Sequence, residues 1–143
     1  MTPARATDAS VPGELPDRIA ARAIDVAVMI GVDVLLGWTI GFGWKWLATG
    51  STLVLAYFVL FDALLGATPG KMRMGLRVVS VAGGKPSLTQ ALVREAFTVL
   101  GAIPFVGPIL AFAAWYWIIR TILANPTRRG KHDEIAGTRV VRG

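Results

Sequence analysis

The chain contains no cysteine among its 143 residues, which excludes disulfide bonds, zinc–thiolate centres and cysteine nucleophiles. Charge is also scarce, because Asp, Glu, Lys and Arg together make up 17% of the chain, against roughly 25% in ordinary soluble domains. Apolar residues reach 54%, and the mean hydropathy is +0.57. This composition excludes a disordered chain and argues against a soluble enzyme. We expect a membrane protein without catalytic residues and without a cofactor.

The first residues differ from the rest of the chain. Residues 1–17 contain several prolines and no apolar periodicity, so we predict a disordered leader. They lack the apolar core of a secretory signal peptide. Residues 18–143 are sufficient for one domain. The net charge is +6, and in so apolar a chain the expected partner is the anionic face of a membrane rather than nucleic acid.

Apolar blocks long enough to cross a bilayer follow the leader. The first runs from Ala23 to Gly43 and the second from about Leu47 to Gly66. At about 1.5 Å per helical residue, such a block crosses a hydrocarbon core of about 30 Å. Between them, Trp44–Trp46 places two tryptophans around a lysine, which is typical of a membrane–water interface.

The last apolar region allows two interpretations. It forms either one helix over Phe97–Ala124, or two helices over Leu88–Ile103 and Pro108–Ala124. In the second case the prolines and the glycine at residues 104–108 separate the two helices. Three crossings would divide the 15 lysines and arginines almost evenly across the membrane. Four crossings place all of them on the cytoplasmic side except Lys45, which the positive-inside rule prefers.

We therefore predict an all-α membrane protein, a four-helix transmembrane bundle whose short third helix is only partly immersed. Both termini are expected in the cytoplasm. Gly75–Val79 and Gly137–Val141 are similar β-branched runs after a glycine. On the same side of the membrane they can pair as a small two-stranded ribbon, in which Arg139 and Val141 pair with Arg77–Val81.

The first apolar block carries charged residues on one face. At 100° per residue, four of them fall within an arc of about 80°, namely Arg18, Arg22, Asp25 and Asp33. This stripe is expected to face the bundle interior, with both arginines close enough to pair with Asp25.

Depth in the membrane gives a second constraint. Asp25, Asp62 and Arg120 each lie about one turn inside the cytoplasmic end of a predicted helix, so we expect them to meet in one layer. Asp33 lies near the middle of the membrane without an obvious basic partner. These four residues are the candidate ion or proton site, and the alternative is a buried salt-bridge layer that fixes the order of the helices.

The remaining cations are assigned to the membrane surface. Thr68–Gly70 is predicted to end the second helix and turn the chain along this surface. We expect lipid-phosphate contacts from Lys71, Arg73, Arg128, Arg129 and Lys131. The single His132 has no second histidine and no cysteine with which to bind a metal, so we predict that it is solvent-exposed or caps a helix.

Several motifs, in this order along the chain, resemble the RDD family of small bacterial membrane proteins. They are Arg18–Asp25, Gly66–Lys71 with Gly75–Val79, Arg94, and His132–Val141. The family name refers to one arginine and two aspartates. The resemblance implies Arg18 and Asp25 as the first two, and Asp133, or alternatively Asp62, as the third. Gly70, Lys71 and Arg94 match further signature positions.

The resemblance also implies the bacterial cytoplasmic membrane and transport of an unknown ligand, and cation/proton antiport is associated with a family member. We expect an ion-transport component that works as a homo-oligomer on a monovalent cation or a proton. The alternative is a non-transporting scaffold whose basic cytoplasmic face binds lipids or a partner protein. Asp33 discriminates between them, because only a transporter needs its carboxylate.

The tail supplies one further prediction. Asp133 lies among Arg128, Arg129 and Lys131, and an acid in so basic a tail is expected to have a specific partner. We predict that Arg18 and Asp133 form a partly buried pair that locks the tail beneath the bundle. If they do not touch, Asp25 is the better partner for Arg18.

Overall fold

The computed structural model describes residues 11–102 and 106–143. The elements run in the order α1 (Leu15–Ile40), α2 (Trp44–Leu65), α3 (Pro69–Arg73), β1 (Leu76–Ser80), α4 (Leu88–Glu95), the 3-10 helix η1 (Ala96–Ala102), α5 (Gly107–Ala124), α6 (Lys131–Ala136) and β2 (Thr138–Arg142).

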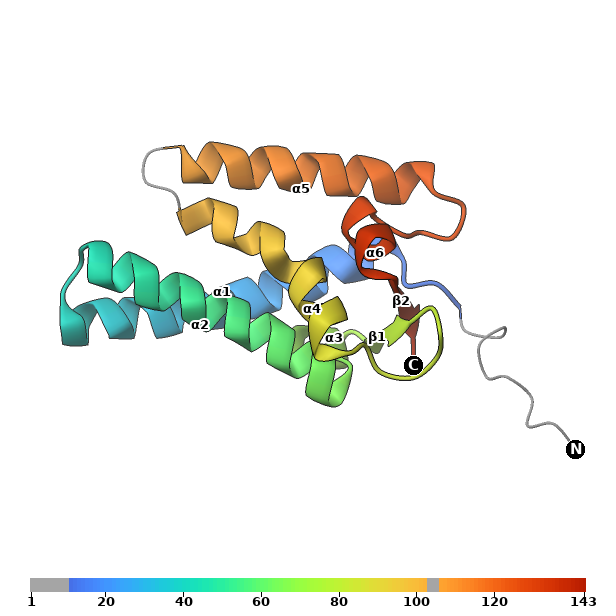
Figure 1. Ribbon diagram of the computed structural model, residues 1–143, viewed down its shortest axis with the longest axis horizontal. Helices are drawn as coiled ribbons and strands as arrows, with labels where there is room; N and C mark the ends of the chain where they lie inside the picture. Colours follow the sequence, from blue (N-terminus) through green and yellow to red (C-terminus); the bar gives the residue numbers. More distant parts are fainter. Residues whose placement is uncertain (1–10, 103–105) are drawn as a thin grey trace, which may run out of the picture.

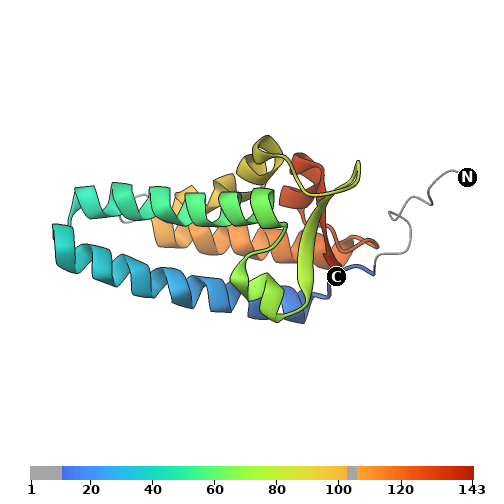
Figure 2. The ribbon, with the colours of Figure 1, turned by 90° about the horizontal axis from the view of Figure 1, so that it is seen from below.

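The long helices lie side by side, and the short elements gather at one end of them (Figure 1). The turn between α1 and α2 lies at the opposite end. Figure 2 shows the sheet, α3 and α6 beside the start of α1 and the C-terminus. The mostly helical fold and its small sheet are therefore confirmed.

Two of the described helices, α2 and α5, are long and apolar enough to cross a membrane. A four-helix transmembrane bundle stays a prediction.

The last apolar region forms two separate helical segments. The α4–η1 segment ends at Ala102 and α5 begins at Gly107, so a single helix over Phe97–Ala124 is excluded. Ser87 begins α4 with a capping box, in which its hydroxyl accepts a hydrogen bond from the Gln90 backbone N–H.

The sheet has the predicted partners. β1 and β2 are antiparallel, with Arg77 opposite Val141 and Val79 opposite Arg139. Successive residues of a strand point to opposite faces of a sheet. Val78 and its partner Val140 therefore lie on the face opposite to that of Arg77 and Arg139. These two valines pack with Leu76 and Ala21 into the hydrophobic core.

The predicted boundary between leader and domain at residue 18 is too late. Pro12 bridges to Val141, the Arg142 N–H donates to the Val11 carbonyl at 2.9 Å, and α1 already begins at Leu15. The segment is ordered because it pairs with the edge of β2, which would otherwise expose unpaired backbone groups. Residues 1–10 of the predicted leader lie outside the described residues.

Candidate functional site

Eight charged side chains meet where the short elements cover the ends of α1 and α2. This charge cluster consists of four basic and four acidic residues: Arg18, Arg22, Lys71, Arg94, Asp25, Asp62, Glu95 and Asp133. The acids are 0–1% exposed. Ions taken out of water are stable only when they are paired and hydrogen-bonded, so each contact in the cluster matters for the fold.

Arg18 and Asp133 form the predicted pair, at 2.7 Å between Nη2 and Oδ2. The Asp133 carboxylate also accepts hydrogen bonds from Arg94, from the Thr138 hydroxyl and from the Gly130 backbone N–H. A second arginine therefore shares the same acid. The pair joins the start of α1 to α6. Burial, and to a smaller extent the charge of Arg22, lower the Arg18 pKa to about 10.

Asp62 binds Lys71, whose ammonium lies 2.7 Å and 2.9 Å from the two carboxylate oxygens. Arg94 Nε lies 3.5 Å from the same carboxylate. Burial lowers the Lys71 pKa, and the Asp62 charge opposes this effect. The expected contact of Lys71 with lipid phosphate is wrong, because the turn of α3 directs its side chain inward to Asp62.

Arg22 pairs with Glu95 rather than with Asp25, and its Nη2 lies 2.9 Å from Oε2. Its guanidinium also packs 4.0 Å from the centroid of the Phe58 ring and 5.1 Å from that of Trp115. The sequence predictions missed Glu95 as a site residue. Its position next to Arg94, inside an otherwise apolar block, was the signal that could have found it.

Within the described part of the chain, Asp25 accepts hydrogen bonds from uncharged groups only. They come from the Tyr57 hydroxyl at 2.9 Å, the Gly70 N–H at 2.8 Å and the Thr68 hydroxyl. A Cβ atom at Gly70 would lie 2.1 Å from the Ala21 carbonyl oxygen. Glycine is therefore required for α3 to approach α1 closely enough to bind this carboxylate.

The predicted layer of Asp25, Asp62 and Arg120 does not form. Arg120 is exposed, and its Nη1 donates to the Tyr116 hydroxyl at 3.1 Å. The inward face of α5 carries Ile118 and Ile122, and Arg120 is about 200° around the helix from Ile118. Arg94, from α4, supplies the counter-charge instead.

The other predicted lipid-contact residues divide into two groups. Arg73, Arg128 and Lys131 are exposed, and their contact with lipid stays a prediction. Arg129 is half-buried and donates to the Thr138 carbonyl at 3.0 Å and to that of Asp133 at 3.4 Å. Its side chain therefore holds the tail together.

His132 is neither solvent-exposed nor a helix cap. Its side chain is 10% exposed, and its ring meets the Phe97 ring edge-on with 5.8 Å between centroids. Burial lowers its pKa well below 6.5, and Arg94 is the next largest cause. Within residues 11–102 and 106–143, no group of three or more metal-ligating side chains is placed to hold an ion.

Asp33 lies apart from the charge cluster, farther along α1. No described residue donates a hydrogen bond to its carboxylate or pairs with it. The side chain lines a cavity of about 180 Å³ together with Gly50, Ser51 and Thr98. A Cβ atom at Gly50 would lie 2.3 Å from Asp33 Oδ1, so this glycine makes room for the carboxylate between α1 and α2.

The outward faces of the helices carry large apolar side chains. Trp38 is 80% exposed, Phe112 78% and Ile109 70%. Such a surface, around helices that end in a buried ionic cluster, defines a small helical membrane protein.

The model of the RDD family matches residues 12–137, so the chain belongs to the RDD family. It is also 38% identical over 89 residues to the uncharacterized membrane protein YteJ of Bacillus subtilis (strain 168). That match covers 61% of this chain and 47% of YteJ, so the chain spans about half the length of this curated relative. No solved structure matches the chain.

Proposed function

We propose that this protein is a transport component that moves or exchanges a small monovalent cation or a proton, working as a homo-oligomer in the cytoplasmic membrane of a bacterium. The observation that carries this proposal is the carboxylate of Asp33, which has no partner among the residues that the structure describes. Buried or half-buried acids in membrane helices are costly, and an unpaired one points to an ion or proton pathway.

The other candidate acids are less suited to carry an ion. Asp62 is bound by Lys71, and Asp25 accepts three hydrogen bonds from fixed donors. A cation at either carboxylate would have to displace buried partners. Arg120 is exposed and has no acid beside it among the described residues. We therefore do not include it in the proposed site.

The cavity at Asp33 offers suitable ligand atoms. Ser51 Oγ donates to the Leu47 carbonyl at 2.5 Å, and Thr98 Oγ1 donates to that of Glu95 at 2.7 Å. Each hydroxyl oxygen keeps a lone pair for another group. Hard cations such as Na⁺ and Li⁺ prefer oxygen ligands of this kind. The cavity at Asp33 measures only about 180 Å³ in one copy, which is why we propose an oligomer for the complete pathway.

The charge cluster has a supporting role in this proposal. It holds the ends of α1, α2 and α4 in place, so that the Asp33 cavity keeps its shape. With the cluster and both termini on the cytoplasmic side and Lys45 outside, Asp33 would lie near mid-membrane. We propose no enzymatic activity.

Transport can be tested with purified protein in liposomes that contain a trapped pH dye. Pulses of Na⁺, K⁺ or Li⁺ are expected to change the internal pH, and Asp33→Asn is expected to abolish that change while the protein remains folded. Asp17→Asn is the matched control, because Asp17 lies on the same helix but outside the cavity. Unchanged activity in Asp33→Asn would refute the role of this carboxylate.

The alternative function, a scaffold, is favoured by the charge balance of the cluster. The cluster contains as many acids as cations, while Arg73, Arg77, Arg128 and Lys131 remain exposed at the same end. Such an end can bind anionic lipids or an acidic partner without any transport. The absence of any cation-dependent pH change in well-folded samples would favour this function.

A further inference from the structure

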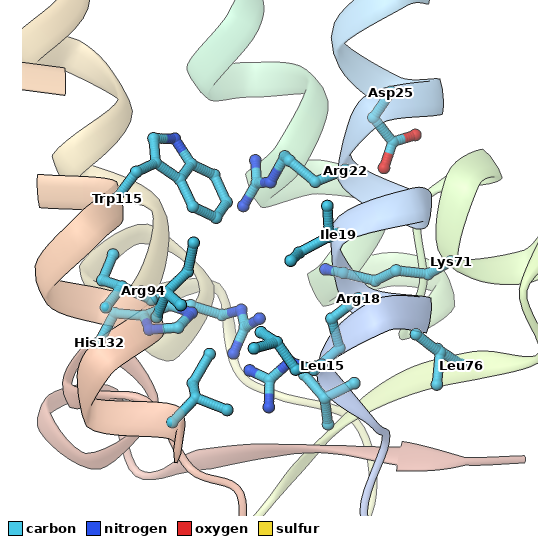
Figure 3. Close-up of a pocket in the computed structure, with 14 residues that line it drawn as sticks. Leu15, Arg18, Ile19, Arg22, Asp25, Lys71, Leu76, Arg94, Trp115 and His132 are labelled. Carbon is cyan, nitrogen blue, oxygen red and sulfur yellow. The ribbon is translucent and has the colours of Figure 1, made fainter. Parts of the chain in front are cut away.

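A crevice between α1 and α5 lies next to the charge cluster (Figure 3). Its walls are apolar, with Leu15 and Ile19 from α1 and with Ile119 and Ile122 from α5. Ile19 is 46% exposed, whereas Ile122 is 2% exposed. The crevice therefore opens on the outer side of the molecule, between two helices whose outward faces are apolar.

Four cationic groups border this crevice. Figure 3 shows the side chains of Arg18, Arg22, Lys71 and Arg94 converging on the same space from α1, α3 and α4. Among the described lining residues Asp25 alone is acidic, and its oxygens already accept three hydrogen bonds. The carboxylates that pair with these cations, those of Asp62, Glu95 and Asp133, do not line the crevice, so its lining carries more positive than negative charge.

Two of these arginines keep donors for a further partner. Among the described contacts, Arg22 donates only through Nη2, to Glu95. Among the same contacts, Arg94 donates only through Nη1, which leaves its Nη2 without a described acceptor. Its Nε makes no hydrogen bond, but it faces the carboxylates of Glu95 at 3.4 Å and Asp62 at 3.5 Å. The Arg94 side chain is only 3% exposed. Buried guanidinium donors without acceptors are costly, so a bound anion that accepts from them would be stabilising.

The size and the walls of the crevice restrict the anion. Its free volume is about 40 Å³, enough for about three water molecules or for the oxygens of one phosphate group. A free phosphate ion would face isoleucine side chains on one side. A phosphodiester whose substituents are apolar would instead extend them along the exposed faces of α1 and α5, where Val26 is 42% and Phe112 78% exposed.

We propose that this crevice binds the phosphate of one anionic phospholipid. Arg22 and Arg94 donate to the phosphate oxygens, Arg18 adds positive charge, and the acyl chains lie against the outer surfaces of α1 and α5. Basic pockets between membrane helices on the cytoplasmic side are suited to anionic head groups. The site is distinct from the Asp33 cavity, and this inference does not depend on ion transport.

The test measures lipid binding to the full-length protein in detergent by native mass spectrometry, with thermal unfolding as a second readout. The probes are phosphatidylglycerol, phosphatidylcholine and inorganic phosphate. We expect one tightly bound phosphatidylglycerol that raises the melting temperature, and weaker binding of phosphatidylcholine, whose choline cation is repelled by the arginines. Equal binding of the two lipids would overturn the proposal, and so would inorganic phosphate that binds as tightly as phosphatidylglycerol.

The lipid site can also be tested with variants that fill the crevice. Ile119→Trp narrows the opening without changing any charge, and we expect it to weaken phosphatidylglycerol binding about tenfold, or about 1.4 kcal/mol. Leu123→Trp is the matched control, because Leu123 is on the same helix, is 53% exposed and does not line the crevice. If Ile119→Trp does not fold, Ile19→Trp narrows the crevice from the opposite wall. Wild-type affinity in the folded variant, or equal losses in variant and control, would refute the site.

Discussion

Asp25 and Asp33 lie on the same stripe of α1, yet their surroundings are opposite. Asp25 is 1% exposed and accepts three hydrogen bonds. Asp33 is half-buried, and none of the described residues pairs with its carboxylate. The comparison teaches that helical phase alone does not separate a structural acid from a functional one. The difference lies in whether neighbouring elements supply donors.

The charge cluster and the Asp33 cavity therefore have different energetic roles. Removing one partner of a buried ion pair leaves an uncompensated charge and typically costs about 3–5 kcal/mol. A carboxylate without a partner loses no such interaction when it is neutralised. Mutations at the two places are expected to differ first in stability and only then in activity.

The largest loss of stability is expected from substitution of Asp133, because both Arg18 and Arg94 donate hydrogen bonds to its carboxylate. Asp133→Ala should lower the free energy of unfolding by about 3–5 kcal/mol, and Arg18→Ala by somewhat less, because Arg94 still holds the acid. The double variant should lose less than the sum of the two. Denaturant unfolding in detergent measures this cycle, and additive losses would show that the two residues do not interact.

A control for this cycle is available at the surface. Asp17 pairs with Arg142, and their side chains are 23% and 49% exposed. Asp17→Ala is expected to cost about 0–1 kcal/mol, as exposed pairs do. A loss as large as that of Asp133→Ala would remove the distinction between buried and exposed pairs.

The next effect concerns the approach of α3 to α1. Gly70→Ala places a Cβ atom 2.1 Å from the Ala21 carbonyl oxygen, so α3 must shift away from Asp25. We expect a loss of about 1–3 kcal/mol in the free energy of unfolding. Gly31→Ala, also in a helix but with no atom within 4 Å of the new Cβ, is the matched control and should gain about 0.5–1 kcal/mol. Equal effects would contradict the close contact at Gly70.

Burial of His132 is expected to make the stability of the protein depend on pH. The folded protein keeps this buried imidazole neutral, with its pKa well below 6.5. The unfolded chain protonates it near 6.5, so unfolding takes up a proton below that pH. Stability should therefore fall as the pH is lowered from 6.5, by up to about 1.4 kcal/mol per unit, until the folded-state pKa is reached.

This slope can be assigned to one residue, because the chain contains a single histidine. Unfolding midpoints between pH 7 and pH 5.5, measured for the wild type and for His132→Gln, isolate its contribution. The variant should lose the slope just below pH 6.5. A slope that persists there would have to come from other groups.

The smallest effect is expected at Asp33. Asp33→Asn should change the free energy of unfolding by less than about 0.5 kcal/mol, because the carboxylate has no described partner to lose. Asp62→Asn, the same change at a residue bound by Lys71, should cost several times more. Thermal unfolding of the two variants side by side gives the comparison, and similar losses would mean that Asp33 is also structural.

Much of the fold followed from local patterns. The apolar blocks, the break near Pro108, and the β-branched runs at Gly75 and Gly137 predicted the helices and the sheet. The Arg18–Asp133 pair was also predicted, since the tail had to return to the cytoplasmic end of the first helix. The partners of Lys71, Arg22 and His132 were not predicted, because they depend on how short helices are oriented over the bundle.

The sequence by itself determined that this is a membrane protein with apolar helices, one charged stripe and a small sheet, because length, periodicity and charge distribution are properties of the chain. Only the tertiary structure decided which charges are paired. Ion pairs such as Arg22–Glu95 and Arg94–Asp62 form over 2.9 Å and 3.5 Å between different helices. The helical phase of a residue fixes the direction of its side chain but not which neighbour it meets. Arg94 therefore occupies the place expected for Arg120, and Asp33 remains an acid of the charged stripe without a described partner.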